Sequence, residues 1–489
     1  MADCQTPDWV KDAVFYQVFP DRFGQTSLDK DGLWRGQRLE PWSAVPTFEG
    51  YKGGDLWAIY ERLGYLQELG ITALYLTPIF ASACNHRYHT HDYYRVDPLL
   101  GGEPAFVALL EESHRRGIRL VLDGVFNHVG RGFLFFNDIL ENGPHSPWLD
   151  WFQVLDWPVS AYDGSLPANY VSWVGNRALP QLNHENPQVR EYLMQVAEYW
   201  IRRGIDGWRL DVPNEITVPG FWSEFRDRIK AINPDAYIVG EIWRDAQPWL
   251  QGDQFDGVMN YVFTGPTIAF TAQERVLSEQ VAGMHYDPMP TLDAPSYQAK
   301  VEALLDRHPW EITLAQLNLL DSHDTARLLS IVEDDRPTVF LATLLLFTFP
   351  GAPCIYYGDE VGLPGRRDPD CRRGFPSPED WDREMLARYK ALSQLRHQWI
   401  ALRRGSYRVL WAEGLTYVFE RRWESERLII GLNAGEVSAI ASLGLSELPT
   451  AVFGEGAWEK GQGTDRYGLN LTGRTGGIWQ LTKTVSDET

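Results

Sequence analysis

The sequence is poor in the features that mark disulfide-stapled, membrane-spanning or exported proteins. Only four of its 489 residues are cysteines, and they show neither a CxxC spacing nor the density of a disulfide scaffold, so we expect free thiols. No uncharged apolar run reaches the length of a membrane span, and the first ten residues lack a charged head followed by an apolar stretch. We therefore predict a cytoplasmic protein without a membrane partner.

Positive charge is also in short supply. The 45 lysines and arginines face 66 aspartates and glutamates, which gives a formal net charge of −21. Such a surface repels phosphate backbones, so a nucleic-acid partner is not expected and a neutral ligand is easier to accommodate. Solubility alone is the alternative reason for this charge. No low-complexity tract interrupts the chain, and the 44% apolar share is ample for a globular core.

The pattern of apolar residues predicts an α/β fold, a (β/α)8 TIM barrel. Short runs rich in β-branched and aromatic residues alternate with amphipathic helical stretches, which is typical of parallel βα units. The eight predicted strands are residues 13–19, 71–76, 118–125, 205–211, 237–241, 255–259, 314–320 and 354–357. The clearest predicted helices are residues 55–69, 103–116, 186–203, 221–232 and 381–402.

Two segments depart from the βα rhythm, and the chain is too long for one core. Residues 128–184 are rich in Trp, Pro, Gly and Asn without a long helical period, which indicates a small domain inserted after the third strand. Residues 403–489 alternate apolar and polar side chains, as in an antiparallel C-terminal β-sandwich. The barrel would then comprise residues 1–127 and 185–402.

Charged and polar side chains stand where several predicted strands end, the place at which a TIM barrel gathers its functional groups. His128 follows the third strand. On the fourth, the two-residue strand period places Arg209 and Asp211 on one face. A neighbouring guanidinium lowers the pKa of a carboxyl, so we expect Asp211 to be ionised, as a nucleophile must be. A buried structural ion pair is the alternative.

Two further carboxyl groups end apolar strands. Glu241 closes the fifth strand with Trp243 just behind it, and such surroundings raise a carboxyl pKa, as a general acid near neutral pH requires. Asp324 follows the seventh strand. In the cleavage of glycosidic bonds one carboxyl group usually acts as the acid and another as the nucleophile, and their different environments set these roles.

These segments, in this order along the chain, resemble the conserved regions of the α-amylase family of glycoside hydrolases. The resemblance is to the cyclomaltodextrinases, neopullulanases and maltogenic amylases in particular, and it runs from about Trp9 into the C-terminal module. The matching segments are residues 123–128, 207–215, 240–243 and 319–325, together with residues 179–183.

The resemblance implies a role for each matching residue. Asp211 would be the nucleophile, Glu241 the general acid/base and Asp324 the carboxylate that holds sugar hydroxyls. The residues implied to bind the sugar on the glycone side are Tyr88, His128, Arg209, His323, Asp368 and Arg372. Trp243 and Trp249 are candidates for the acceptor side, with core packing as the alternative for both.

Three departures from the family pattern limit what the resemblance implies. The subgroup's extra N-terminal β domain has no counterpart before the first strand, so either a monomer or a homodimer is expected. Asp31, Gly53 and Asp55 keep only part of a calcium loop, so calcium is a candidate ligand and no cofactor is required. Gln181 and Arg244 replace a lysine and a histidine, which leaves the linkage preference open.

The sequence therefore predicts a retaining hydrolase of α-1,4-glucosidic bonds, with maltooligosaccharides, cyclodextrins, starch or pullulan as candidate α-glucan substrates. Its carboxyl groups would lie about 5 to 5.5 Å apart, as in other retaining glycosidases. A transglycosylase or glucosyl isomerase on the same barrel is the first alternative. A non-enzymatic family member is the second, although such a chain is expected to lack one or more of the three carboxylates.

Overall fold

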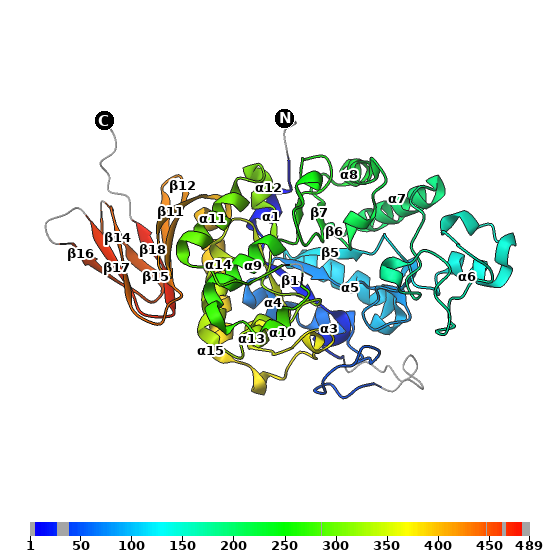
Figure 1. Cartoon of the computed structure of the whole chain (residues 1–489), viewed down its shortest axis with the longest axis horizontal. Coiled ribbons are helices and arrows are strands. Elements are labelled where there is room, and N and C mark those ends of the chain that lie inside the picture. The colour runs from blue at the N-terminus through cyan, green and yellow to red at the C-terminus, as the bar shows by residue number, and fades with distance from the viewer. Residues whose placement is uncertain (1–4, 27–38, 285, 446, 462–465, 482–489) are drawn as a thin grey trace.

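The computed structural model describes residues 5–26, 39–284, 286–445, 447–461 and 466–481 (Figure 1). Its centre is a sheet of eight parallel strands, and a bridge between Met259 and Leu317 joins the two edges into a barrel. The strands, in spatial order, are β8 (Gly257–Val258), β7 (Tyr237–Gly240), β6 (Gly207–Leu210), β5 (Arg119–Gly124), β2 (Ala73–Leu76), β1 (Phe15–Val18), β10 (Ala352–Tyr356) and β9 (Leu317–Asn318). The predicted TIM barrel is confirmed, with each strand inside or overlapping its predicted range.

Helices connect the strands and cover the barrel. They are α1 (Asp8–Asp12), α2 (Pro20–Phe23), α3 (Leu56–Glu61), α4 (Leu63–Leu69), α5 (Gly102–Arg115), α7 (Pro187–Arg202), α8 (Phe221–Ile232), α9 (Tyr261–Ala272), α10 (Ser278–Val281), α11 (Ala294–Leu305), α12 (Trp310–Leu314), α13 (Leu328–Ile331), α14 (Arg336–Thr348), α15 (Arg383–Gln398) and α16 (Ile400–Arg404). Two predicted helices are each divided in two, at Arg62 and at Trp399, and Leu314 ends a helix instead of opening a strand.

The approach of β6 to β7 shows how the sequence positions the site. Helix α7 packs its buried face against the barrel. Gly204 begins the connection to β6 just after the helix, and its φ of +103° is a conformation that glycine adopts without strain. At Gly207 a Cβ atom would lie 2.3 Å from the carbonyl oxygen of Tyr237, so no larger residue fits between the two strands. This close contact sets the register that carries Arg209 to the mouth of the barrel.

The segment between β5 and β6 forms a separate lobe around α6 (Leu134–Asn142) (Figure 1). Bridges between His128 and Gln181 and between Phe152 and Leu182 tie its two ends together. A helix of this length was not expected from the sequence here. The neighbouring hairpin of β3 (Phe80–Ser82) and β4 (Thr90–Val96), after β2, was also not predicted.

The C-terminal part lies at the opposite end of the molecule from α6 (Figure 1). One sheet contains β11 (Ser406–Glu413), β12 (Thr416–Trp423), β13 (Glu426–Asn433), β18 (Thr475–Leu481) and β15 (Thr450–Gly454), and the other β14 (Ala439–Leu443), β17 (Tyr467–Leu471) and β16 (Ala457–Lys460). Their facing side chains, such as Ile429, Leu469 and Trp479, form a second apolar core. Among the described residues no helix is both long and apolar enough to cross a membrane.

Candidate active site

A cavity of about 840 Å³ opens where the barrel strands end at their carboxyl termini. The predicted residues that line it are Tyr88, His128, Asp211, Glu241, Trp243, Trp249, Asp324, Asp368 and Arg372. Arg209 and His323 are not part of the wall, because both are almost completely buried one layer beneath it. The structure thus brings all nine predicted catalytic and sugar-binding residues to one place, two of them as supports of the wall.

Arg209 is the centre of the buried charge network. Its Nη1 donates to Asp123 Oδ1 at 2.9 Å and to Asp211 Oδ1 at 3.1 Å, and its Nη2 forms an ion pair with Glu241 Oε1 at 3.0 Å. One fixed planar cation therefore holds three carboxyl groups from adjacent strands. Its full burial makes each of these attractions stronger than at a surface.

The turn after β6 joins Asp211 to Glu241. Val212 has a left-handed backbone, with φ +36° and ψ +51°, which costs a β-branched residue about 1–3 kcal/mol. In this conformation its N–H donates to Glu241 Oε2 at 3.1 Å, while Trp243 Nε1 lies 3.2 Å from Oε1. The strained turn thus orients the Glu241 carboxyl group beside Asp211.

The expectation that Arg209 keeps the pKa of Asp211 low is wrong. Burial raises the pKa of Asp211 well above its usual value, and the nearby Glu241 carboxyl raises it further, because Arg209 divides its charge among three acids. Burial likewise raises the pKa of Glu241 to about 7, against the opposing effect of Arg209. Because the two carboxyl groups interact strongly, their titration belongs to the pair and not to either residue alone.

Asp324 stands apart from this pair electrostatically. Burial raises its pKa, but His323, Arg372 and Arg209 outweigh that effect and lower it below the ordinary value. Arg372 Nη2 donates to Asp324 Oδ1 at 3.2 Å, and its Nη1 forms an ion pair with Asp368 Oδ1 at 3.0 Å. The electrostatics of the site thus favour an ionised Asp324 beside the coupled acid pair of Asp211 and Glu241.

The two site histidines are neutral and buried. Burial lowers the pKa of each to about 3. His323 bonds the Tyr88 hydroxyl at 2.6 Å and stacks on its ring, with the planes 4° apart. His128 Nε2 lies 4.0 Å from Asp211 Oδ2 and has no hydrogen-bond partner among the described residues. An orphaned polar atom that faces the cavity is suited to a ligand hydroxyl.

Three residues near the site were missed. Gln17 on β1 bonds His323 Nδ1 at 2.7 Å, Tyr75 on β2 donates to Asp123 Oδ2 at 2.8 Å, and Trp173 stacks on His128. Gln17 carries a usable signal, which is a polar side chain within an otherwise apolar buried strand. Tyr75 and Trp173 offered none, because aromatic residues are common in cores.

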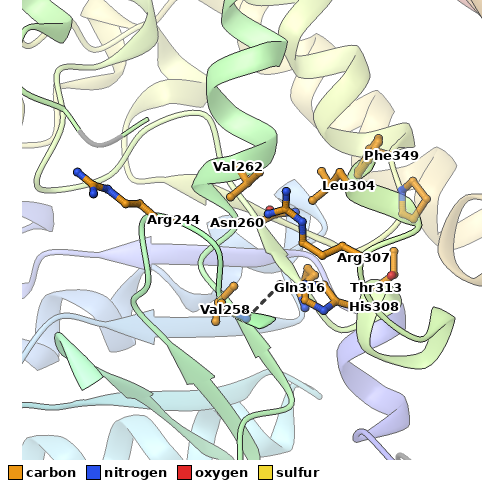
Figure 2. Close-up of a pocket in the computed structure, with 12 residues that line it drawn as sticks. Arg244, Val258, Asn260, Val262, Leu304, Arg307, His308, Thr313, Gln316 and Phe349 are labelled. Atoms are coloured by element: carbon orange, nitrogen blue, oxygen red, sulfur yellow. Dashed lines mark hydrogen bonds between the residues drawn. The ribbon is translucent and has the colours of Figure 1, made fainter. Parts of the chain in front are cut away.

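The two tryptophans of the predicted acceptor side are placed differently. Trp243 lines the cavity and also stacks on Tyr261, with the ring centroids 3.8 Å apart. Trp249 lines the cavity at a half-buried position. Arg244 lines both this cavity and a second one of about 20 Å³ near β8. Figure 2 shows the second cavity, and its described lining residues include Asn260, Arg307, His308 and Gln316 but no acidic residue. That small cavity is therefore not a candidate for carboxylate chemistry.

The predicted calcium loop is only partly described, because Asp31 lies outside the described residues. Asp55 caps α3 by accepting from Ala58 N at 2.7 Å, and its other carboxylate oxygen accepts from the Thr26 hydroxyl at 3.1 Å. Calcium takes six to eight oxygen ligands. The oxygen atoms of Gly53 and Asp55 are too few to form a calcium site by themselves.

Comparison with known proteins agrees with this geometry. Residues 17–391 match the model of the α-amylase catalytic domain. The chain is 44% identical to a cyclomaltodextrinase of a Bacillus species over 84% of this chain and 70% of that protein, and 44% identical to neopullulanase 2 of Thermoactinomyces vulgaris over 88% and 70%. Its sequence is 57% identical to that of the debranching enzyme of Nostoc punctiforme, and the two structures superpose with a TM-score of 0.92 over 98% of this chain and all of that one. The chain belongs to the α-amylase family of glycoside hydrolases.

Proposed function

We propose that this enzyme hydrolyses α-1,4-glucosidic bonds of maltooligosaccharides and related α-glucans with net retention of configuration. The observation that carries the proposal is the sharing of one guanidinium by two carboxyl groups on the cavity wall: Asp211 lies 3.1 Å from Nη1 of Arg209, and Glu241 lies 3.0 Å from Nη2. Retaining enzymes hold their carboxyl groups about 5–5.5 Å apart, whereas inverting ones leave about 6.5–9.5 Å for a water. Because Asp211 and Glu241 contact neighbouring nitrogens of one guanidinium, the geometry favours the shorter separation of a retaining enzyme.

The reaction proceeds by double displacement. Glu241, holding the proton of the acid pair, protonates the departing glycosidic oxygen while Asp211 attacks the anomeric carbon and forms a glucosyl-enzyme. Glu241 then takes a proton from water, which attacks the same carbon and restores Asp211. Asp324, kept ionised by Arg372, accepts hydrogen bonds from sugar hydroxyls and favours the distorted ring.

Stereochemistry tests this proposal directly. Proton NMR spectra recorded during the first minutes of maltotetraose hydrolysis should show the α anomer of the new reducing end before mutarotation. Early accumulation of the β anomer would mean inversion and overturn the double displacement. Longer or relinked oligosaccharides as the main products would favour the transglycosylase or isomerase alternative. A non-enzymatic role is disfavoured because all three carboxylates are present around the cavity.

Cleavage of α-1,6 bonds is a second candidate activity. It is favoured by the 57% identity to a protein named a debranching enzyme, which extends over 98% of this chain. Pullulan digestion separates the two activities: maltotriose as the end product indicates α-1,6 cleavage, and panose indicates α-1,4 cleavage. We expect both products if the open cavity accepts either linkage, and the absence of maltotriose would remove the α-1,6 candidate.

A further inference from the structure

One cluster of metal-ligating side chains lies beside the active-site cavity and takes no part in the chemistry proposed above. Cys84, His86 and His89 each present one ligand atom, and all three atoms lie within 4.8 Å of one another. Two of them, His86 and His89, line the cavity wall itself. We propose that these three residues form a binding site for a thiophilic divalent cation of the zinc type, and that its occupancy inhibits the enzyme.

The separations suit tetrahedral zinc. A zinc–sulfur bond of about 2.3 Å and a zinc–nitrogen bond of about 2.0–2.1 Å at the tetrahedral angle place the two ligand atoms about 3.6 Å apart. Cys84 Sγ lies 3.5 Å from His86 Nδ1. Because all three ligand atoms lie within 4.8 Å of one another, the separations to the third atom must shorten by at most about 1.5 Å. Three protein ligands leave the fourth position open to solvent in the cavity.

The backbone around the cluster is already folded as a chelating turn. Arg87 has a left-handed φ of +61°, and its N–H donates to the Cys84 carbonyl at 3.3 Å. Its buried side chain is fixed by Asp97 at 2.8 Å. Asn85 donates to two backbone carbonyls of the neighbouring loop, each at 2.8 Å. Little conformational entropy therefore remains to be lost when an ion binds.

The surroundings of the donor atoms favour a soft cation. Ser82 donates to the His89 carbonyl at 2.7 Å and lies 3.4 Å from Cys84 Sγ, which positions both groups. A neutral imidazole offers a ring-nitrogen lone pair to a metal, and binding of the metal to the cysteine releases the thiol proton. A thiolate and two imidazoles form a ligand set typical of zinc and not of calcium or magnesium.

A bound cation would affect the reaction centre through Tyr88. The backbone N–H of Tyr88 donates to His86 Nδ1 at 3.2 Å, the same atom that a bound cation would use. Loss of that hydrogen bond shifts Tyr88, whose hydroxyl contacts both Asp123 and His323. A displacement of about 1 Å at such a site can cost roughly 100-fold in rate. We expect saturating Zn²⁺ to lower kcat/KM by roughly 10- to 100-fold.

The test separates binding from inhibition. Zn²⁺ titration calorimetry on the whole protein should give one site that is weakened at least about tenfold in Cys84→Ser, because even second-shell changes cost about 10–100-fold. Co²⁺ in place of Zn²⁺ should show a thiolate-to-metal charge-transfer band that the variant lacks. Cys354→Ala, which changes a buried cysteine on β10, is the matched control and should behave as wild type.

Several results would overturn the site: no Zn²⁺ binding, equal binding by Cys84→Ser, or no charge-transfer band. If Cys84→Ser does not fold, protection of Cys84 in the wild type from alkylation by Zn²⁺, read by peptide mass spectrometry, decides the same question. The proposed inhibition by zinc rests on the proposed hydrolytic activity. Zinc binding without inhibition would overturn the inhibition alone, whereas absence of hydrolysis by the metal-free wild type would count against the proposed function.

Discussion

Asp211→Asn is expected to reduce kcat on maltooligosaccharides by about 10⁴- to 10⁶-fold, the range seen when a nucleophile or its essential partner is removed from a hydrolase. An amide has the size of the carboxylate but cannot form the covalent glucosyl intermediate. It can still accept the hydrogen bond from Arg209 that Asp211 accepts at 3.1 Å. Substrate binding, measured by calorimetry with the inactive variant, should therefore persist.

The matched control lies next to the other end of the same strand. Asp206 precedes β6 and accepts from Leu120 N at 2.8 Å and from Arg119 at 2.8 Å, on the face of the barrel that faces away from the cavity. Asp206→Asn should leave kcat within a few-fold of wild type. Near-normal turnover by Asp211→Asn, with a circular dichroism spectrum and Tm close to those of wild type, would refute its role as nucleophile.

Glu241→Gln is expected to lower kcat on maltotetraose by roughly 10²- to 10⁴-fold, the usual contribution of a general acid. In the wild type the acid must be protonated, and burial raises the pKa of Glu241 to about 7. Activity should therefore be lost as pH rises through about 7, and that alkaline limb of the kcat/KM profile should disappear in the variant. An activated substrate such as a nitrophenyl maltoside should lose much less activity, since its leaving group needs no proton.

Glu360 is a suitable control for burial alone. Burial also raises the pKa of Glu360, but its carboxylate accepts hydrogen bonds from Tyr16 and Tyr65 and does not reach the cavity wall. Glu360→Gln should keep the alkaline limb. A limb that persists in Glu241→Gln, or an equal loss of activity on both substrates, would show that Glu241 is not the acid.

The barrel could be predicted from the sequence because its signals are local. A fully buried parallel strand is mostly apolar, so each strand was visible as a short apolar run between helices. The two-residue strand period placed Arg209 and Asp211 on one face, and both do point to the same network. The hairpin of β3 and β4 was not predicted, because its polar residues follow no strict alternation.

The pKa of Asp211 shows what local reasoning cannot provide. An arginine next to a single aspartate lowers the pKa of that aspartate, but only when the cation has no other partner. Here burial, together with the carboxyl groups of Glu241 and Asp123 from neighbouring strands, raises the pKa of Asp211 instead. The titration of this acid pair is therefore a property of the assembled barrel.

The barrel and the polar residues at its strand ends can be read from the sequence, because burial and strand period act on neighbours in the chain; the three carboxyl groups were assigned through the family resemblance. Which of those groups share a charge follows only from the folded barrel. Gln17 contacts His323 across 306 positions, and Tyr88 reaches both His323 and Asp123. Such contacts are set by closure of the barrel, and electrostatic energies depend on those distances and on burial.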